Sequence, residues 1–187
     1  GPNCADGQRF RQIDQSVGSH DALTRLQQHI GTIESFMRFG SIRHFVAVTD
    51  DESSLPAIAF DALLRARSPD YADYVFHSIV GLNGGGCVAG VGNQYFTLSN
   101  LTKGLKAHIC NANWAQVFNA LGQNVATATT KLKLAKKPLP GTIKVSFDGF
   151  QASEGAHWKY DATINQIIIV KQPQAGAKIK VCYEHQP

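Results

Sequence analysis

The sequence has no apolar run near the roughly 20 residues that a helix needs to cross a bilayer, so it predicts no transmembrane segment. It also shows no signal peptide at its start. The first two residues, Gly-Pro, match the remnant of a cleaved tag, so an export signal could lie upstream of them. The cellular compartment must therefore be predicted from other features.

Charge is scarce and scattered along the chain. Charged residues make up 17% of the 187 positions and apolar residues 43%, and the net charge is +4. This composition is typical of a globular protein. The densest basic cluster, KLKLAKKP at 131–138, contains lysines but no aromatic residue. Nucleic-acid-binding surfaces prefer a basic stripe with aromatics between the charges, so we interpret this cluster as a solvated linker and expect no nucleic-acid partner.

Cysteine is also rare, with Cys4, Cys87, Cys110 and Cys182 far apart in the sequence. No Cys-x-x-Cys spacing occurs, which argues against a zinc site or thioredoxin-type redox chemistry. Widely spaced cysteines fit disulfides in an exported protein. The alternative is a set of buried free thiols in a cytosolic protein.

Common catalytic patterns are missing. The chain has no Gly-x-Ser-x-Gly turn of a serine hydrolase, and no carboxylate pair has a clear acid and base assignment. The glycine-rich stretch GLNGGGCVAG lacks the full dinucleotide-binding pattern, with Ala89 in place of its last glycine, and we expect no amphipathic helix directly after it. We predict that the protein is not an enzyme.

The first 130 residues alternate between helical and extended patterns. Apolar residues at helical spacing predict helices over 19–39 and 113–126, and signals for a helix start predict another over about 54–66. Apolar, valine-rich runs predict strands over 43–49 and 73–81. This alternation favours an α/β fold with a Rossmann-like parallel sheet flanked by helices.

Polar and special residues predict where these helices begin and end. We expect Ser19 to cap the first helix and Gly40 to end it. Ser53 or Ser54 should cap the second helix, with Pro56 in its first turn, where the missing N–H does no harm.

The pattern changes near Lys131, where prolines and a glycine interrupt the chain. Beyond it, alternating or β-branched runs predict strands over 142–148, 165–170 and 178–184, with turn residues between them. The sequence therefore predicts two domains, an α/β domain over 1–130 and a small antiparallel β domain over 131–187.

Oxygen-bearing side chains cluster at one edge of the predicted parallel sheet. Asp50 and Asp51 follow the first strand, and Ser19 opens the helix before it. Helix N-termini and strand carboxyl ends meet at the same edge of such a sheet, where ligands bind. A hydroxyl and a carboxylate there are hard ligands suited to Mg²⁺ or Ca²⁺.

Two cysteines are expected at the same edge. Cys87 lies in the glycine-rich loop after the second predicted strand, and Cys110 lies just before the helix over 113–126. We predict that they form a disulfide, and leave Cys4 and Cys182 without an assigned partner.

Four segments carry a family resemblance: VGSHDALTRL, RHFVAVTDDES, YVFHSIVG and YFTLSNLTKGL followed by NWAQVFNALGQNV. Their order and spacing resemble the second half of a von Willebrand factor A domain, the fold shared with integrin inserted domains, over about residues 16–126. The similarity is greatest to secreted bacterial members. Such domains hold a divalent cation at a metal-ion-dependent adhesion site. The resemblance matches Asp50 with the aspartate of the third metal loop and Ser19 with the threonine of the second.

The chain departs from this family in one respect. The first metal loop, Asp-x-Ser-x-Ser, is absent, and DDESS has similar letters but stands at the third-loop position. Either the other half of the domain lies on another part of the protein, or the site has been lost. Two ligands alone would hold a cation weakly.

Two functions remain open. The resemblance implies a secreted or cell-surface adhesion module of the bacterial envelope, whose Mg²⁺ or Ca²⁺ binds an acidic group of a protein or glycan partner. The alternative is a structural component of a cell envelope or fibre that binds neighbouring chains without metal. The metal ligands in the first case are Ser19 and Asp50.

Overall fold

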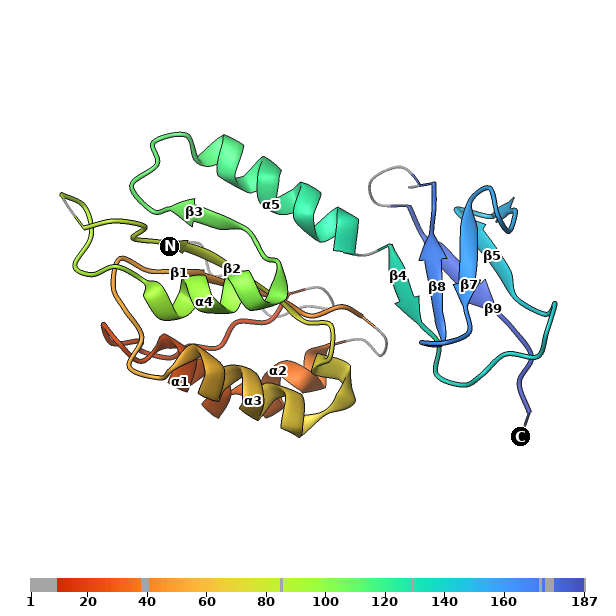
Figure 1. Cartoon of the computed structure of the whole chain (residues 1–187), viewed down its shortest axis with the longest axis horizontal. Helices are drawn as coiled ribbons and strands as arrows, with labels where there is room; N and C mark the ends of the chain where they lie inside the picture. The colour runs from red at the N-terminus through yellow and green to blue at the C-terminus, as the bar shows by residue number, and fades with distance from the viewer. Residues whose placement is uncertain are drawn as a thin grey trace. The chain divides into compact units, whose positions relative to one another are not determined.

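A computed structural model describes residues 10–37, 41–84, 86–128, 130–171, 173 and 177–186. The chain divides into two compact units (Figure 1). Unit 1 comprises the chain up to residue 38 and residues 43–120, and unit 2 comprises residues 39–42 and 121–187. Among the described residues, no helix is long and apolar enough to cross a membrane.

Unit 1 is built on a parallel sheet of three strands in the order β1-β2-β3. The strands are β1 (His44–Val48), β2 (Val75–Val80) and β3 (Lys106–His108). Parallel strands need crossover connections, and α3 (Ala57–Arg67) and α4 (Asn93–Thr102) supply them. The predicted strands over 43–49 and 73–81 are thereby confirmed, with slightly shorter bounds.

The segment before β1 forms two short helices rather than one. They are α1 (Ala22–Gln28) and α2 (Ile30–Phe36), and they meet at His29, whose ring nitrogen Nε2 lies 3.1 Å from Gln15 Oε1. The prediction of Ser19 as N-cap is wrong, because Asp21 holds that position. The Asp21 carboxylate accepts the Gly18 N–H at 2.7 Å, which keeps residues 18–21 in a turn and delays the helix. Gly40, the predicted end of this helix, lies outside the described residues.

Helix α3 begins three residues later than predicted, after Pro56. Ser53 and Ser54 do not cap it. Ser53 Oγ instead accepts the Leu55 N–H at 3.1 Å within its own turn, and the first helical N–H, that of Ala57, donates to Gln94 Oε1 at 2.8 Å. A side chain from α4 thus satisfies the start of α3.

Helix α4 is an element that the sequence pattern did not predict. It follows the glycine-rich loop almost at once, contrary to expectation, since its N-cap is Gly92. Its buried face mixes apolar Tyr95 and Leu98 with polar Ser99 and Thr102. Ser99 hydrogen-bonds with Ser78 on β2, and Thr102 Oγ1 accepts the Phe76 N–H at 2.8 Å.

Helix α5 (Trp114–Ala128) agrees with the helix predicted over 113–126. It follows β3 in the chain, and Figure 1 shows it alongside that strand. Strand β3 and the one-turn helix η1 (Pro69–Tyr71) were not predicted. The core of unit 1 is rich in aromatic rings, with Phe45, Phe60, Tyr71, Tyr74, Phe76 and Tyr95 among its buried members.

Unit 2 contains two antiparallel sheets of three strands each. One has the order β4-β8-β7, with β4 (Lys131–Lys133), β7 (Trp158–Asp161) and β8 (Gln166–Ile169). The other has the order β6-β5-β9, with β5 (Lys144–Phe147), β6 (Phe150–Ala152) and β9 (Ile179–Cys182). The predicted strands correspond to β5, β8 and β9, whereas β4, β6 and β7 were missed.

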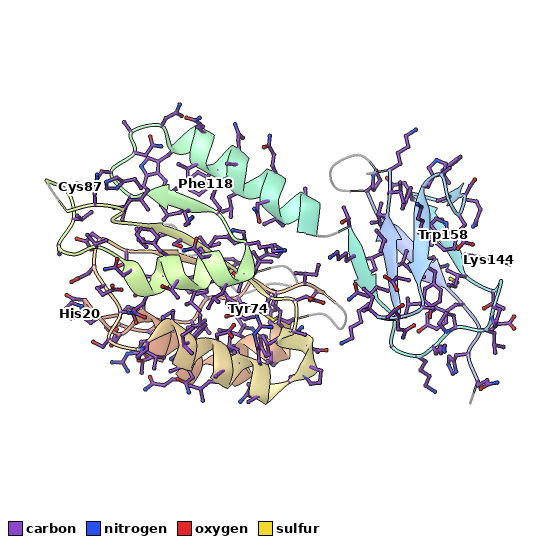
Figure 2. The ribbon with its side chains drawn as sticks, in the orientation of Figure 1. His20, Tyr74, Cys87, Phe118, Lys144 and Trp158 are labelled. Carbon is purple, nitrogen blue, oxygen red and sulfur yellow. A yellow bond between two sulfur atoms is a disulfide. The ribbon has the colours of Figure 1, made fainter. Side chains whose placement is uncertain are left out.

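A single apolar cluster fills unit 2, and Trp158 is its largest side chain (Figure 2). The Trp158 ring nitrogen donates to the Ala152 carbonyl at 3.0 Å, so its polar atom is satisfied inside the core. The structure as a whole is therefore mixed α/β, with one parallel sheet in unit 1 and antiparallel sheets in unit 2.

Candidate functional site

The candidate site is the edge of unit 1 at which the parallel strands end. The turn at 18–21, the loop at 49–56 and the loop at 81–92 lie there, as does the connection between β3 and α5. Figure 2 shows His20 and Cys87 at the same end of the unit, although they belong to different loops. Ligands of open parallel sheets bind at this edge.

His20 joins the turn before α1 to the loop after β1. Its ring nitrogen Nδ1 lies 3.0 Å from the Glu52 carbonyl oxygen and 3.5 Å from Asp51 Oδ1. Its own carbonyl accepts the Ser54 N–H at 2.9 Å. Because a carbonyl oxygen only accepts, Nδ1 carries a proton in this arrangement. The structure thus brings together the two segments that the sequence placed at one edge.

The adjacent aspartates occupy different surroundings. Asp51 is only 13% exposed, and its Oδ1 accepts the Glu52 N–H at 2.8 Å. Asp50 is exposed, and its backbone carbonyl accepts the N–H groups of Ala89 and Gly90 at 2.8 and 3.0 Å. Asp51 therefore stabilises the loop, whereas the Asp50 carboxylate faces solvent.

Glu52 connects this loop to α4. Its carboxylate oxygens accept the N–H groups of Asn93 and Gln94 at 2.7 and 3.0 Å. These are the first N–H groups of α4, where the helix dipole favours negative charge. The role of Glu52 could not be predicted without α4.

Tyr95 places its hydroxyl beneath the same loop. Burial raises the pKa of Tyr95, the Ser53 hydroxyl lowers it, and the carboxylates of Glu52, Asp51 and Asp21 raise it. The buried phenol therefore stays protonated at neutral pH.

The glycine-rich loop packs directly against the end of β1. A side chain at Gly90 would begin 2.9 Å from Asp51 Oδ1, and one at Gly81 would begin 2.6 Å from the Gly90 carbonyl oxygen. A Cβ at Gly81 would require a shift of the backbone, and a Cβ at Gly90 would require the Asp51 carboxylate to move. The glycine-rich loop is therefore closely packed at its ends.

A disulfide between Cys87 and Cys110, the pair expected from the sequence, joins this loop to the β3–α5 connection. Their Cα atoms are 5.9 Å apart. Next to it, His108 Nε2 lies 2.7 Å from Asn83 Oδ1. Cys182 is free and exposed, and Cys4 lies outside the described residues.

The two predicted metal ligands lie in adjacent segments, because Ser19 precedes His20 and Asp50 precedes Asp51. Both residues are exposed, and neither side chain has a hydrogen bond to another described residue. Within the described ranges, no group of three or more His, Cys, Asp or Glu side chains is placed to hold a metal ion. This edge thus offers two side chains with oxygen ligands for a metal ion, which is fewer ligands than Mg²⁺ or Ca²⁺ requires.

Comparisons of the chain with protein-family models, with curated proteins and with solved structures found no match. The resemblance to a von Willebrand factor A domain therefore stays a prediction from the sequence.

Proposed function

We propose that the chain is a ligand-binding module of the von Willebrand factor A type, from a secreted or surface-exposed bacterial protein. In this proposal unit 1 is the second half of a Rossmann-like domain. The observation that carries it is the contact of the Ser19 turn with the Asp50 loop through His20. Two oxygen-bearing side chains lie beside this contact, free of hydrogen bonds to the described residues.

A divalent cation is the partner that this chemistry favours. Ser19 and Asp50 would contribute two hard oxygen ligands, and water would fill other positions. An acidic group of a protein or glycan would occupy an open position, and further ligands would come from sequence outside residues 1–187. The module binds its ligand and does not transform it.

Titration calorimetry of the full chain with Mg²⁺ tests this proposal. We expect binding on the order of 1 mM, because only two protein ligands are present. Asp50→Ala should weaken the affinity for Mg²⁺ at least fivefold while leaving the fold intact, since its carboxylate supports no other described group. Asp51→Asn is the matched control. Asparagine has nearly the same size and shape as the buried aspartate, so this variant should leave the affinity for Mg²⁺ nearly unchanged.

Two results would contradict the cation proposal. One is equal Mg²⁺ affinity in Asp50→Ala and the parent, and the other is no heat of binding in the parent. The second result would favour the alternative function, a structural component that binds neighbouring chains without metal.

One feature supports that alternative. Strand β1 is an edge strand of the described sheet, and it exposes 44% of Val46 and 56% of Val48. An edge strand with exposed valines can pair with a strand of another chain. Substituting lysine for both valines should abolish such an association in sedimentation experiments, with or without a chelator.

A further inference from the structure

Unit 2 contains a cavity of about 360 Å³ that the proposed function does not use. This volume lies at the lower end of the ~300–1,000 Å³ typical of small-molecule sites. Its walls combine aromatic and charged side chains, which are Phe147, Asp148, Phe150, His157 and Lys171.

Aromatic rings form a corner of this cavity. The His157 ring lies edge-on to Phe147 and Phe150, with interplanar angles of 65° and 66° and centroid distances of 6.5 and 5.7 Å. The Phe150 side chain is 62% exposed, so its ring is accessible from solvent. Its ring face is electron-rich and attracts positively polarised C–H groups.

Polar groups on the same walls keep some atoms that make no hydrogen bond to the described residues. Asp148 Oδ1 accepts the Lys178 N–H at 2.8 Å, and its Oδ2 has no hydrogen bond among the described residues. His157 Nδ1 accepts the Ser153 N–H at 3.2 Å, so the neutral ring carries its proton on Nε2. Lys171 adds an ammonium group. The cavity therefore offers a ligand one hydrogen-bond acceptor, Asp148 Oδ2, and two donor groups, the His157 Nε2–H and the Lys171 ammonium.

The acceptor is held in place by a tight turn. Asp148 and Gly149 have φ angles of 46° and 88° and connect β5 to β6 in a two-residue hairpin loop. The Asp148 N–H also donates to the Lys178 carbonyl at 3.0 Å. Because the backbone is fixed on both sides, little ordering is needed when a ligand binds.

From this combination we propose that unit 2 binds a sugar, with a pyranose ring stacked on Phe150 and its hydroxyls bound by Asp148 and Lys171. One positive and one negative group at the walls disfavour a simple ion of either sign. Asp148 and Lys171 are exposed, and a wholly apolar ligand would displace water from them without replacing its hydrogen bonds. A neutral ring with an apolar C–H face and hydroxyls at its rim satisfies all of these groups.

Saturation-transfer NMR on the full chain tests this proposal with four probes: methyl α-glucopyranoside, methyl α-mannopyranoside, methyl β-galactopyranoside and N-acetylglucosamine. We expect at least one of them to show saturation of its ring C–H protons. Phe150→Ala should lower the affinity for that sugar at least fivefold. Asp148→Asn should lower it at least threefold, because the amide nitrogen replaces an acceptor with a donor while the turn tolerates asparagine.

Phe118→Ala is the matched control for the aromatic contact. Phe118 lies on α5 (Figure 2), is 57% exposed and does not line the cavity, so its removal should leave sugar binding unchanged. The proposal is overturned if none of the four sugars gives a signal, or if Phe150→Ala binds as tightly as the parent. An equal loss in Phe118→Ala would also overturn it.

Discussion

The carboxyl edge of unit 1 and the cavity of unit 2 both carry acidic and aromatic side chains, yet they use them differently. At the edge, Glu52 binds the first N–H groups of α4, and Asp51 binds a neighbouring N–H and lies near His20. In the cavity, Asp148 and Lys171 keep polar atoms that no described residue occupies. Asp51 and Asp148 each accept one backbone N–H through Oδ1, but Asp51 is only 13% exposed whereas Asp148 is exposed, so the second oxygen of Asp148 is accessible to a ligand.

The same comparison separates residues within the edge itself. Asp50 and Ser19 resemble the cavity groups more than they resemble their neighbours Asp51 and Glu52, because they are exposed and support no other described side chain. This is the physical reason for assigning binding to Asp50 and folding to Asp51.

The two units can be compared directly because each contains one of the two tryptophans, Trp114 in unit 1 and Trp158 in unit 2. Trp158→Phe leaves a fluorescence reporter in unit 1, and Trp114→Phe leaves one in unit 2. Each prediction below should affect one reporter and spare the other.

The largest effect is expected from the disulfide. Replacing both Cys87 and Cys110 with serine should lower the free energy of unfolding of unit 1 by about 3 kcal/mol, because the bridge closes a loop with a sequence separation of 23 residues. Urea unfolding followed by Trp114 fluorescence measures this change. An equal loss of stability in unit 2, measured by Trp158 fluorescence, would contradict the division of the chain into two separately stable units.

A fall in pH should also lower the free energy of unfolding of unit 1. His77 is fully buried and its Nδ1 accepts the Leu105 N–H at 3.0 Å, so its Nε2–H donates to His44 Nδ1 at 2.9 Å. Burial, with a smaller contribution from His44, lowers the pKa of His77 to about 4. Burial also lowers the pKa of His44.

The sign of the pH effect follows from the lowered pKa values. Between the unfolded pKa of 6.5 and a folded pKa of about 4, the unfolded chain binds more protons, so stability is lost as the pH falls. At pH 5 the loss for His77 is about 2 kcal/mol relative to pH 7. Urea unfolding at both pH values tests this, and His77→Gln should reduce the difference. A pH-independent stability of unit 1 would show that the histidine pair titrates normally.

The smallest effect is expected from Glu52→Gln. The amide keeps one acceptor for the N-terminus of α4 but removes the negative charge, so we expect a loss of about 1 kcal/mol in unit 1. Asp50→Asn, which changes an exposed carboxylate in the same loop, should change stability by less than about 0.5 kcal/mol. If the two variants lose equal stability, Glu52 does not have the special role assigned to it.

Strong periodic patterns allowed much of unit 1 to be predicted. The valine-rich runs, the apolar stripe of α5 and the start signals of α3 indicated the alternation of helix and parallel strand. Helix α4 could not be predicted in this way, because buried Ser99 and Thr102 interrupt its apolar stripe. Their hydroxyls are satisfied by Ser78 and by the backbone of β2, a compensation that only the folded structure shows.

The candidate sites were predictable to different degrees. Topology alone placed Ser19, Asp50 and the two cysteines at one edge. The roles of Asp51 and Glu52 depend on α4 and on the close approach of Gly90, so the sequence did not indicate them. The cavity of unit 2 combines residues from β5, from β6 and from loops, and strands as short as β6, with three residues, leave too little pattern to detect.

The link between Cys87 and Cys110 also changes what a protease can do to this protein. Helix α4 and strand β3 lie between the two cysteines in the chain. A single cut anywhere in that span leaves both pieces covalently joined, so the cleaved protein keeps its mass under non-reducing conditions and separates only when reduced. In an oxidising environment, a nicked molecule would thus retain its carboxyl-edge loops as one unit.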